Sequence, residues 1–196
     1  VESHVRITAY DTFGNESNGV TLAVIPADDV SPTVSITGVT DGAHYKVDAT
    51  PQVSVFDNNL SSKVITLNGS VYDPSPITAE GNYALSVSAV DGAGNQTSKT
   101  ITFTIDKTSP SIIISGIAEG IFYNTDRIPE FTITDVNLKE SSVTLNNETY
   151  AHGSSITDEG SYTLTATAAD NAGNVSAKTI NFAIDKTSPA IVISAP

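Results

Sequence analysis

The sequence predicts an all-β chain of tandem antiparallel β-sandwiches with about seven strands each. Apolar and polar residues alternate with a period of two, and no segment has the spacing of an amphipathic helix. One pattern also returns after about 78 residues. The alternation indicates strands with one buried and one exposed face. The repeat indicates that the same sandwich occurs more than once.

The repeat is visible when segments of the chain are aligned. TPQVSVFDNNL at 50–60 matches IPEFTITDVNL at 128–138, and the segment DGAGN at 91–95 matches DNAGN at 170–174. From these matches we expect four parts: the C-terminal hairpin of a truncated preceding repeat at 1–27, whole repeats at 32–106 and 110–185, and the first strand of a further repeat at 189–196.

The longest alternating strand of each repeat begins at a tyrosine. Tyr83 and Tyr162 each stand two residues after a glycine, and Leu85 and Leu164 follow two residues later. A tyrosine at this place is typical of the tyrosine corner, in which its hydroxyl bonds the backbone a few residues upstream. Leucine stands where antibody domains have cysteine, so we expect a core without a disulfide.

The composition excludes several classes of function. The chain has no Cys, which excludes disulfides and zinc–cysteine sites. Acidic residues number 22 against 9 basic ones, giving a formal net charge of -13, which repels nucleic acid and anionic lipid. No apolar run approaches the roughly 20 residues that span a bilayer, so we expect no membrane insertion. No nucleophile elbow or unusual carboxylate pair is present, so we expect no enzyme.

The segment IDKTSP, at 105–110 and again at 184–189, joins one repeat to the next. Pro110 and Pro189 fix their own φ and favour an extended conformation for the preceding serine. A linker this short cannot coil, so it predicts units placed end to end as a semi-rigid rod. The first linker, IPADDVSP at 25–32, is longer, and we expect the first joint to bend differently.

Several of these segments carry a resemblance to a known family. The motifs D-x-N-L, T-L-N, E-G-x-Y-x-L, D-x-A-G-N and I-D-K-T-S-P together resemble the tandem bacterial immunoglobulin-like repeats of surface and secreted proteins. The resemblance covers essentially the whole chain and implies immunoglobulin-like sandwiches outside the bacterial cell. It also implies a stalk or spacer that presents another module, needs no cofactor and has neighbouring repeats as its partners.

The resemblance further implies that acidic residues meet at each joint, because the loop after the second strand and the final hairpin of such a sandwich lie where the domain begins. We expect two sets: Asp106, Asp135, Asn137 and Asp170 at the second joint, and Asp28 or Asp29 with Asp57, Asn59 and Asp91 at the first. Calcium takes six to eight oxygen ligands, so an interdomain calcium site is one hypothesis. The same residues are typical of tight turns, where they bond backbone N–H groups.

Two alternative functions remain open. An adhesive or carbohydrate-binding module would engage a cell-wall or host glycan or protein through an exposed aromatic, and Phe13 is the aromatic expected at a hairpin tip. A self-assembling filament or surface-layer subunit would use unpaired strand edges at 1–27 and 189–196 for self-association.

Overall fold

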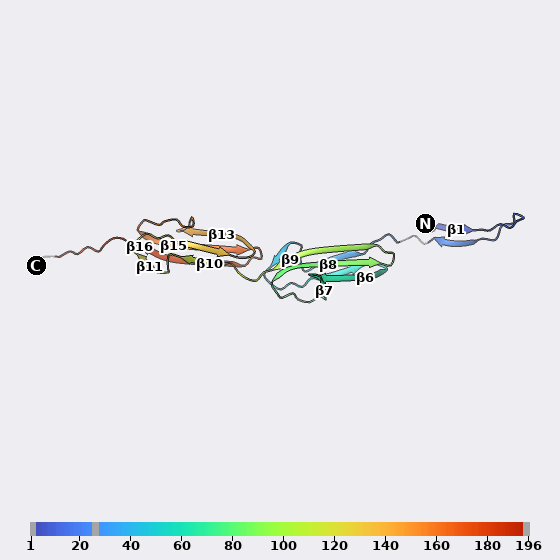
Figure 1. Ribbon diagram of the computed structural model, residues 1–196, viewed down its shortest axis with the longest axis horizontal. Coiled ribbons are helices and arrows are strands. Elements are labelled where there is room, and N and C mark those ends of the chain that lie inside the picture. Colours follow the sequence, from blue (N-terminus) through green and yellow to red (C-terminus); the bar gives the residue numbers. More distant parts are fainter. Residues whose placement is uncertain (1–2, 25–27, 194–196) are drawn as a thin grey trace.

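The protein is represented by a computed structural model that describes residues 3–24 and 28–193. Figure 1 shows a two-stranded hairpin followed by two β-sheet units, arranged one after another along the long axis. All regular structure in these residues is β-strand, which confirms the predicted fold class. The described part of the chain offers no helix long and apolar enough to cross a membrane.

The first unit has seven strands in two sheets, as the sequence predicts. Its small sheet pairs β3 (Thr33–Thr37) with β5 (Gln52–Phe56). Its large sheet has the order β4-β9-β8-β6-β7 and contains β4 (Ala43–Tyr45), β6 (Leu60–Leu67), β7 (Ser70–Val71), β8 (Gly81–Asp91) and β9 (Gln96–Ile105).

The second unit repeats this topology. Its small sheet pairs β10 (Ser111–Ser115) with β12 (Glu130–Thr134). Its large sheet has the order β11-β16-β15-β13-β14 and contains β11 (Ile121–Tyr123), β13 (Leu138–Leu145), β14 (Glu148–Thr149), β15 (Gly160–Asp170) and β16 (Val175–Ile184).

One pairing in each unit is parallel, whereas the sequence predicts antiparallel sandwiches throughout. The short strand β4 runs parallel to β9, and β11 runs parallel to β16. Each of these short strands has only three residues, which is too few for a period of two to be recognised in the sequence. The remaining strand pairs of both units are antiparallel.

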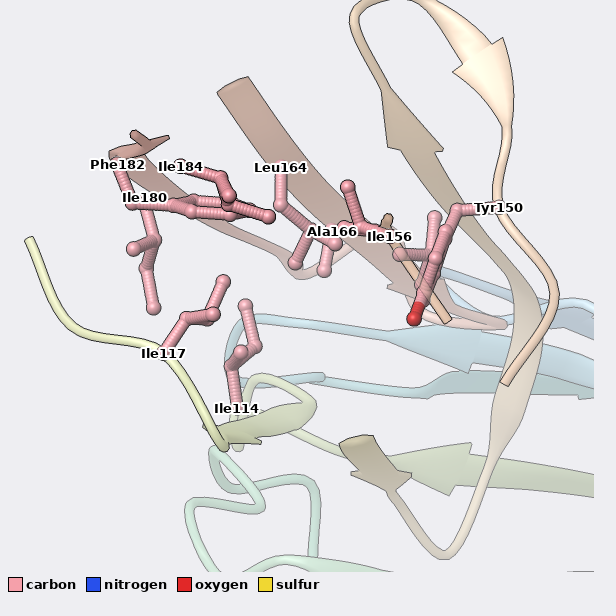
Figure 2. Close-up of a cluster of buried hydrophobic side chains, with 10 residues drawn as sticks. Ile114, Ile117, Tyr150, Ile156, Leu164, Ala166, Ile180, Phe182 and Ile184 are labelled. Atoms are coloured by element: carbon pink, nitrogen blue, oxygen red, sulfur yellow. The ribbon is translucent and has the colours of Figure 1, made fainter. Parts of the chain in front are cut away.

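Each unit encloses its own hydrophobic core. In the second unit, Leu164 of β15 is fully buried and packs with Phe182 of β16 and with Ile114 from the small sheet, as Figure 2 shows. The first unit has an equivalent cluster around Leu85 and Phe103. The alternating residues of the long strands therefore face a core within their own unit, and the two cores are separate.

The tyrosine corner predicted for each unit is present. The hydroxyl of Tyr83 donates to the carbonyl of Ala79 at 2.7 Å, and that of Tyr162 donates to the carbonyl of Asp158 at 2.8 Å. The leucine two residues after each tyrosine has no exposed surface. Both repeats thus close this corner by the same hydrogen bond and need no disulfide beside it.

The N-terminal hairpin consists of β1 (Ser3–Ile7) and β2 (Val20–Val24). It lies within the segment predicted as a hairpin at 1–27, of which residues 1–2 and 25–27 are outside the described part of the chain. Val5 and Ile7 are 50% and 59% exposed, because none of the described residues forms a second sheet over this hairpin.

The strand predicted at 189–196 is not formed over its described residues. Residues 189–193 lie in no strand, and 194–196 are outside the described part of the chain. The corresponding strand of the second unit, β10, pairs with β12. The described residues contain no such partner for 189–193, and without a partner the backbone groups of this segment cannot join a ladder.

Candidate functional site

The site best defined by the structure is the joint between the two units, built around Asp106. This residue follows β9 directly, and its N–H donates to the carbonyl of Tyr45 at 2.9 Å. Its Oδ1 accepts the N–H of Thr108 at 3.1 Å, which is the local turn that aspartate commonly caps. Asp106 is only 7% exposed although it lies in a linker.

Two asparagines of the second unit reach across the joint to Asp106. Nδ2 of Asn137, from the loop between β12 and β13, donates to Asp106 Oδ2 at 2.6 Å. Nδ2 of Asn174, from the hairpin between β15 and β16, donates to the Asp106 carbonyl at 2.8 Å. Lys46 Nζ of the first unit adds a contact of 3.4 Å to the carbonyl of Gly173. The linker is therefore bonded directly to the unit that follows it.

The second joint also gathers three carboxylates. One oxygen from each of Asp106, Asp135 and Asp170 lies within 4.8 Å of the others. Asp135 Oδ1 accepts the N–H of Asn137, and Asp170 accepts both the backbone and the side-chain N–H of Asn174. The structure thus brings together the residues expected at this joint. It also gives them the turn-capping bonds that the alternative interpretation predicts.

Hydrogen bonding keeps the hairpin carboxylates ionised. Burial opposes the charged form of Asp170, but hydrogen bonds from the side chain and backbone of Asn174 and from two further amides outweigh it and lower the pKa of Asp170. Burial likewise opposes ionisation of Asp91, and the equivalent bonds from Asn95 and its neighbours lower the pKa of Asp91. Each joint therefore contains at least one negative charge at neutral pH.

The first joint contains the equivalent carboxylates. Oxygens of Asp28, Asp57 and Asp91 lie within 4.8 Å of one another. Asn95 Nδ2 donates to the Asp28 carbonyl at 2.9 Å, as Asn174 does to Asp106 at the second joint.

The sequence left Asp28 and Asp29 as alternatives, and only Asp28 belongs to the acidic group. Both Asp28 and Asp106 stand four residues before the proline that opens a unit, so this spacing distinguishes them. The predicted amide Asn59 forms its bonds within the first unit, to its own loop and to the hairpin between β8 and β9. Its N–H donates to Asp57 and its carbonyl accepts the N–H of Gly92.

A group of residues without a predicted role fastens the linker to the preceding unit. We call it the latch, and it consists of Asp48, Thr78, Glu80, Lys107 and Thr108. Lys107 Nζ donates to Asp48 Oδ1 at 2.5 Å and to the Thr78 carbonyl at 2.6 Å. The N–H of Lys107 and the hydroxyl of Thr108 both donate to the Glu80 carboxylate. Asp106 thus reaches forward to the next unit, while Lys107 reaches back.

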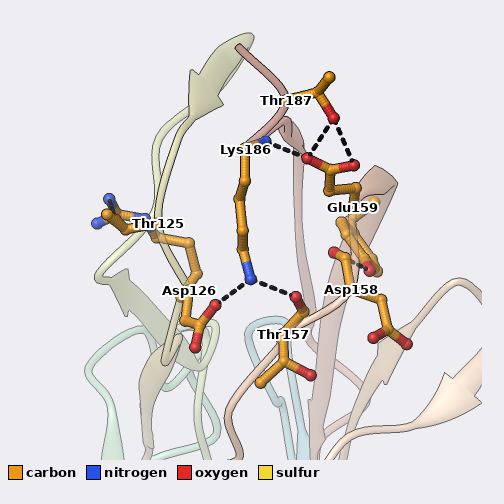
Figure 3. Close-up of polar contacts among 9 residues, drawn as sticks. Thr125, Asp126, Thr157, Asp158, Glu159, Lys186 and Thr187 are labelled. Carbon is orange, nitrogen blue, oxygen red and sulfur yellow. Dashed lines mark hydrogen bonds and ion pairs between the residues drawn. The ribbon is translucent and has the colours of Figure 1, made fainter.

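The second unit carries an identical arrangement, which we call the second latch: Asp126, Thr157, Glu159, Lys186 and Thr187. Figure 3 shows Lys186 between Asp126 and the Thr157 carbonyl, with its N–H and the Thr187 hydroxyl on Glu159. All five positions recur at repeat spacing in the sequence. That recurrence is the signal from which the latch could have been found.

The aromatic residue expected at the hairpin tip is exposed. Phe13 lies between β1 and β2 with 90% of its surface accessible, and its N–H donates to Asp11 Oδ1 at 2.8 Å. No described residue outside the hairpin holds it in place by a hydrogen bond. A ligand contact at Phe13 remains a prediction.

Comparisons with solved structures extend over most of the chain at low sequence identity. The fibronectin(III)-like modules of Clostridium thermocellum CbhA align over 78% of this chain and 94% of theirs, with 13% identity and a TM-score of 0.38. Extracellular cadherin domains 3–6 of protocadherin gamma B2 align over 93% of this chain and 56% of theirs, with 12% identity and a TM-score of 0.35. No curated protein sequence matches the chain.

Two family profiles match the sequence, one in each unit. Residues 50–107 match a profile described as bacterial Ig-like domain, and residues 153–195 match one described as bacterial Ig-like domain, group 3. Together the matches cover about half of the chain, and both include the last two long strands of a unit, β8 and β9 in the first and β15 and β16 in the second. The chain is therefore built from tandem bacterial immunoglobulin-like repeats.

Proposed function

We propose that this chain is a structural spacer whose units are held in line by fastened joints, so that it presents another module at a distance. The observation that carries the proposal is that linker residues 106–108 bond both neighbours at once. Asp106 and Thr108 accept hydrogen bonds from Asn174 of the second unit. Lys107 and Thr108 donate to Glu80 of the first.

The physical reason is the small freedom left to such a linker. Each ordered residue loses about 1–2 kcal/mol of backbone entropy, and here that ordering is offset by charge-assisted hydrogen bonds on both sides. Pro110 is buried and fixes its own φ at the start of the second unit. With the linker fastened in this way, bending requires several bonds to break together. In this proposal the spacer works outside the bacterial cell, as the family resemblance implies, and carries out no catalytic step.

The proposal is tested by the distribution of distances between the two units. The chain has no cysteine, so Ser70→Cys in β7 and Glu148→Cys in β14 provide unique labelling sites at corresponding exposed positions of the two units. We expect a single narrow distance distribution from single-molecule energy transfer. The matched control inserts six Gly/Ser residues between Ser109 and Pro110 and should broaden the distribution. Equal widths in the two proteins would contradict the spacer proposal.

A second proposal concerns calcium at the joints, and the observation that favours it is the approach of three carboxylates within 4.8 Å. Asp106, Asp135 and Asp170 offer the hard oxygen ligands that calcium prefers, and Asn137 offers an amide oxygen nearby if its side chain turns. The Asp28, Asp57 and Asp91 group offers the same chemistry at the first joint. A bound cation would relieve the repulsion among these carboxylates and would tie the linker to two loops of the next unit.

Thermal unfolding with calcium and with a chelator tests this second proposal. At a calcium concentration ten times Kd, we expect the Tm to rise by about 5–10 °C. Asp135→Asn should remove the part of the rise that belongs to the second joint. Asp73→Asn, an exposed acid outside both groups, is the matched control and should keep it. An unchanged Tm in the native sequence would show that the carboxylates serve only as turn caps.

A further inference from the structure

The parallel pairing in each unit has a mechanical consequence for a chain stretched from its two ends. In the first unit the chain enters before β3 and leaves after β9, and β4 runs parallel to β9 with Ala43 opposite Phe103 and Tyr45 opposite Ile105. Tension therefore pulls β4 and β9 lengthwise in opposite directions. Bonds between two strands loaded in this way share the force and must break together.

Further hydrogen bonds extend this pairing at its upstream end. The N–H of Gly42 donates to the carbonyl of Thr102 at 2.7 Å. Asp41 Oδ1 accepts both the N–H of Thr102, at 2.6 Å, and its hydroxyl, at 3.1 Å. The bonded contact between these two segments is thus longer than the three-residue ladder alone.

The latch closes the same contact at its downstream end. The N–H of Asp106 donates to Tyr45, and one residue later Lys107 Nζ bonds Asp48 and the Thr78 carbonyl. Lys107 lies where the chain leaves the unit, so the latch is the first contact to receive a pull from the C-terminal side. An end-to-end pull therefore loads the latch together with β9, and the latch bonds share the force carried by the β4–β9 pairing.

The second unit repeats each part of this arrangement with some changes of residue. Glu119 takes the place of Asp41 and accepts the backbone and side-chain N–H groups of Asn181. Gly120 donates to the Asn181 carbonyl, and Asp185 donates to Tyr123. The second latch then closes the downstream end. Two units with different side chains at the upstream end therefore keep the same bonded path.

From this geometry we infer that the latch is a load-bearing clamp, which slows unfolding of each unit when the chain is under tension. The inference rests on the proposed spacer function, because a spacer between a cell and its target carries tension. Lys107 and Asp48 keep 34% and 50% of their side-chain surface exposed, so their ion pair is weak in the absence of force. Because this ion pair lies in the path that carries the force, it affects the rate of unfolding under tension more than it affects the stability of the unloaded chain.

The test is single-molecule stretching of the whole chain, held by its two ends, with Lys107→Met. This change removes the charge and the donors but keeps an aliphatic side chain of similar length. At a fixed force, one of the two unfolding events should become roughly three- to tenfold faster. The other event belongs to the intact second unit and serves as an internal reference. Lys186→Met should shift the other event, and the double variant should shift both.

Two controls separate a load-bearing role from a general loss of stability. Lys99→Met changes an exposed lysine of β9 that has no ion-pair partner among the described residues, and it should leave both events unchanged. In the second control the chain is pulled through cysteines at Asn58 and Ser70, which bracket β6 and leave β9 out of the loaded path. Lys107→Met should then have no effect. Equal acceleration in both pulling geometries, or none in end-to-end pulling, would overturn the inference.

Failure of the clamp and failure of the spacer proposal give different results. A broad distribution of distances between the units, with unfolding that still depends on Lys107, would refute the spacer proposal and keep the clamp. A narrow distance distribution together with no effect of Lys107→Met on unfolding would keep the spacer proposal and refute the clamp.

Discussion

The joint before the first unit and the joint between the units hold the same acidic group in different surroundings. Asp28 is exposed, whereas Asp106 at the corresponding position is buried. The capping bond is present in both, since Asp28 Oδ1 accepts the N–H of Val30 and Asp106 Oδ1 accepts that of Thr108. Both joints therefore contain the same turn, but the aspartate of the turn is buried only at the second joint.

The difference follows from the residues around the turn. Asp29 stands where the second linker has Lys107, so the first linker has no ammonium that could form a latch. Asn137 donates to the carboxylate of Asp106, whereas Asn59 is exposed and forms its bonds within the first unit. Among the described residues, the second joint is consequently fastened by more bonds than the first.

A third copy of the turn shows which part is local. Asp185 follows β16 as Asp106 follows β9, and it makes the same two bonds, to the carbonyl of Tyr123 and to the N–H of Thr187. Asp185 is nevertheless exposed, because no described unit follows it. The turn therefore forms from its own sequence and its own unit, while burial of the carboxylate needs the loops of a following unit.

The largest effect is expected at the hairpin aspartate, where the two joints should behave alike. Asp170→Ala leaves the backbone N–H and one side-chain N–H of Asn174 without their acceptor, and the loss of such a charge-assisted buried interaction should lower the free energy of unfolding by about 2 kcal/mol. Hydrogen exchange of the second unit in urea would measure it. Asp91→Ala is the matched change in the first unit and should loosen that unit instead. A loss confined to one of the two hairpins would break the equivalence of the joints.

Acid should destabilise both hairpins, but by less than Asp170→Ala or Asp91→Ala does. Protonation leaves the carboxyl group one acceptor oxygen, whereas the alanine variants remove the group entirely. The pKa values of Asp91 and Asp170 are lowered in the folded chain, so the ionised form stabilises the fold. This contribution is present above the unfolded pKa of about 3.9 and is lost as the pH falls through the lower folded value. Hydrogen bonds also lower the pKa of Asp41 and Glu119, so acid unfolding must be compared between the native sequence and Asp170→Asn. A steeper acid transition in the variant would contradict this sign.

Substitution of the linker aspartates should affect the stability of the two units differently. Asp106→Ala removes the carboxylate that bonds Asn137 and Thr108. We expect the free energy of unfolding of the second unit to fall by about 1–2 kcal/mol, because Asn137 is left without its partner. Asp28→Ala removes only an exposed turn cap and should change the first unit little. Urea titration followed by hydrogen exchange in each unit measures both. Equal losses would mean that burial of Asp106 contributes nothing to its role.

Much of this arrangement could be predicted from the sequence, because it depends on local pattern and on the topology of the sandwich. The two-residue alternation predicted the strands and cores, and the position of Tyr83 predicted its corner. The same topology predicted that Asp106, Asp135 and Asp170 would converge. What the alternation could not predict is the parallel strand β4, because three residues are too few to show a period.

The latch was missed for a different physical reason. Lys107 and Asp48 are 59 positions apart, and each is of a type that is commonly exposed and unpaired. Nothing in either local segment indicates that they meet, since their approach depends on the parallel pairing of β4 with β9. Recurrence of Asp48 and Asp126 at the repeat spacing is the trace that this contact leaves in the sequence.

The smallest expected effect concerns the amide that distinguishes the joints. Asn137→Ala removes the donor to Asp106 Oδ2 and should lower the free energy of unfolding by about 0.5–1.5 kcal/mol, since the same carboxylate keeps its bond from the Thr108 N–H at Oδ1. It should also broaden the distance distribution between labels at Ser70 and Glu148, because a bond across the joint is lost. Asn59→Ala is the matched control, because the Asn59 side chain is exposed and its bonds are made by its backbone. If the two variants have the same distance distribution, the amide does not fasten the second joint, and the contrast between the joints rests on the latch alone.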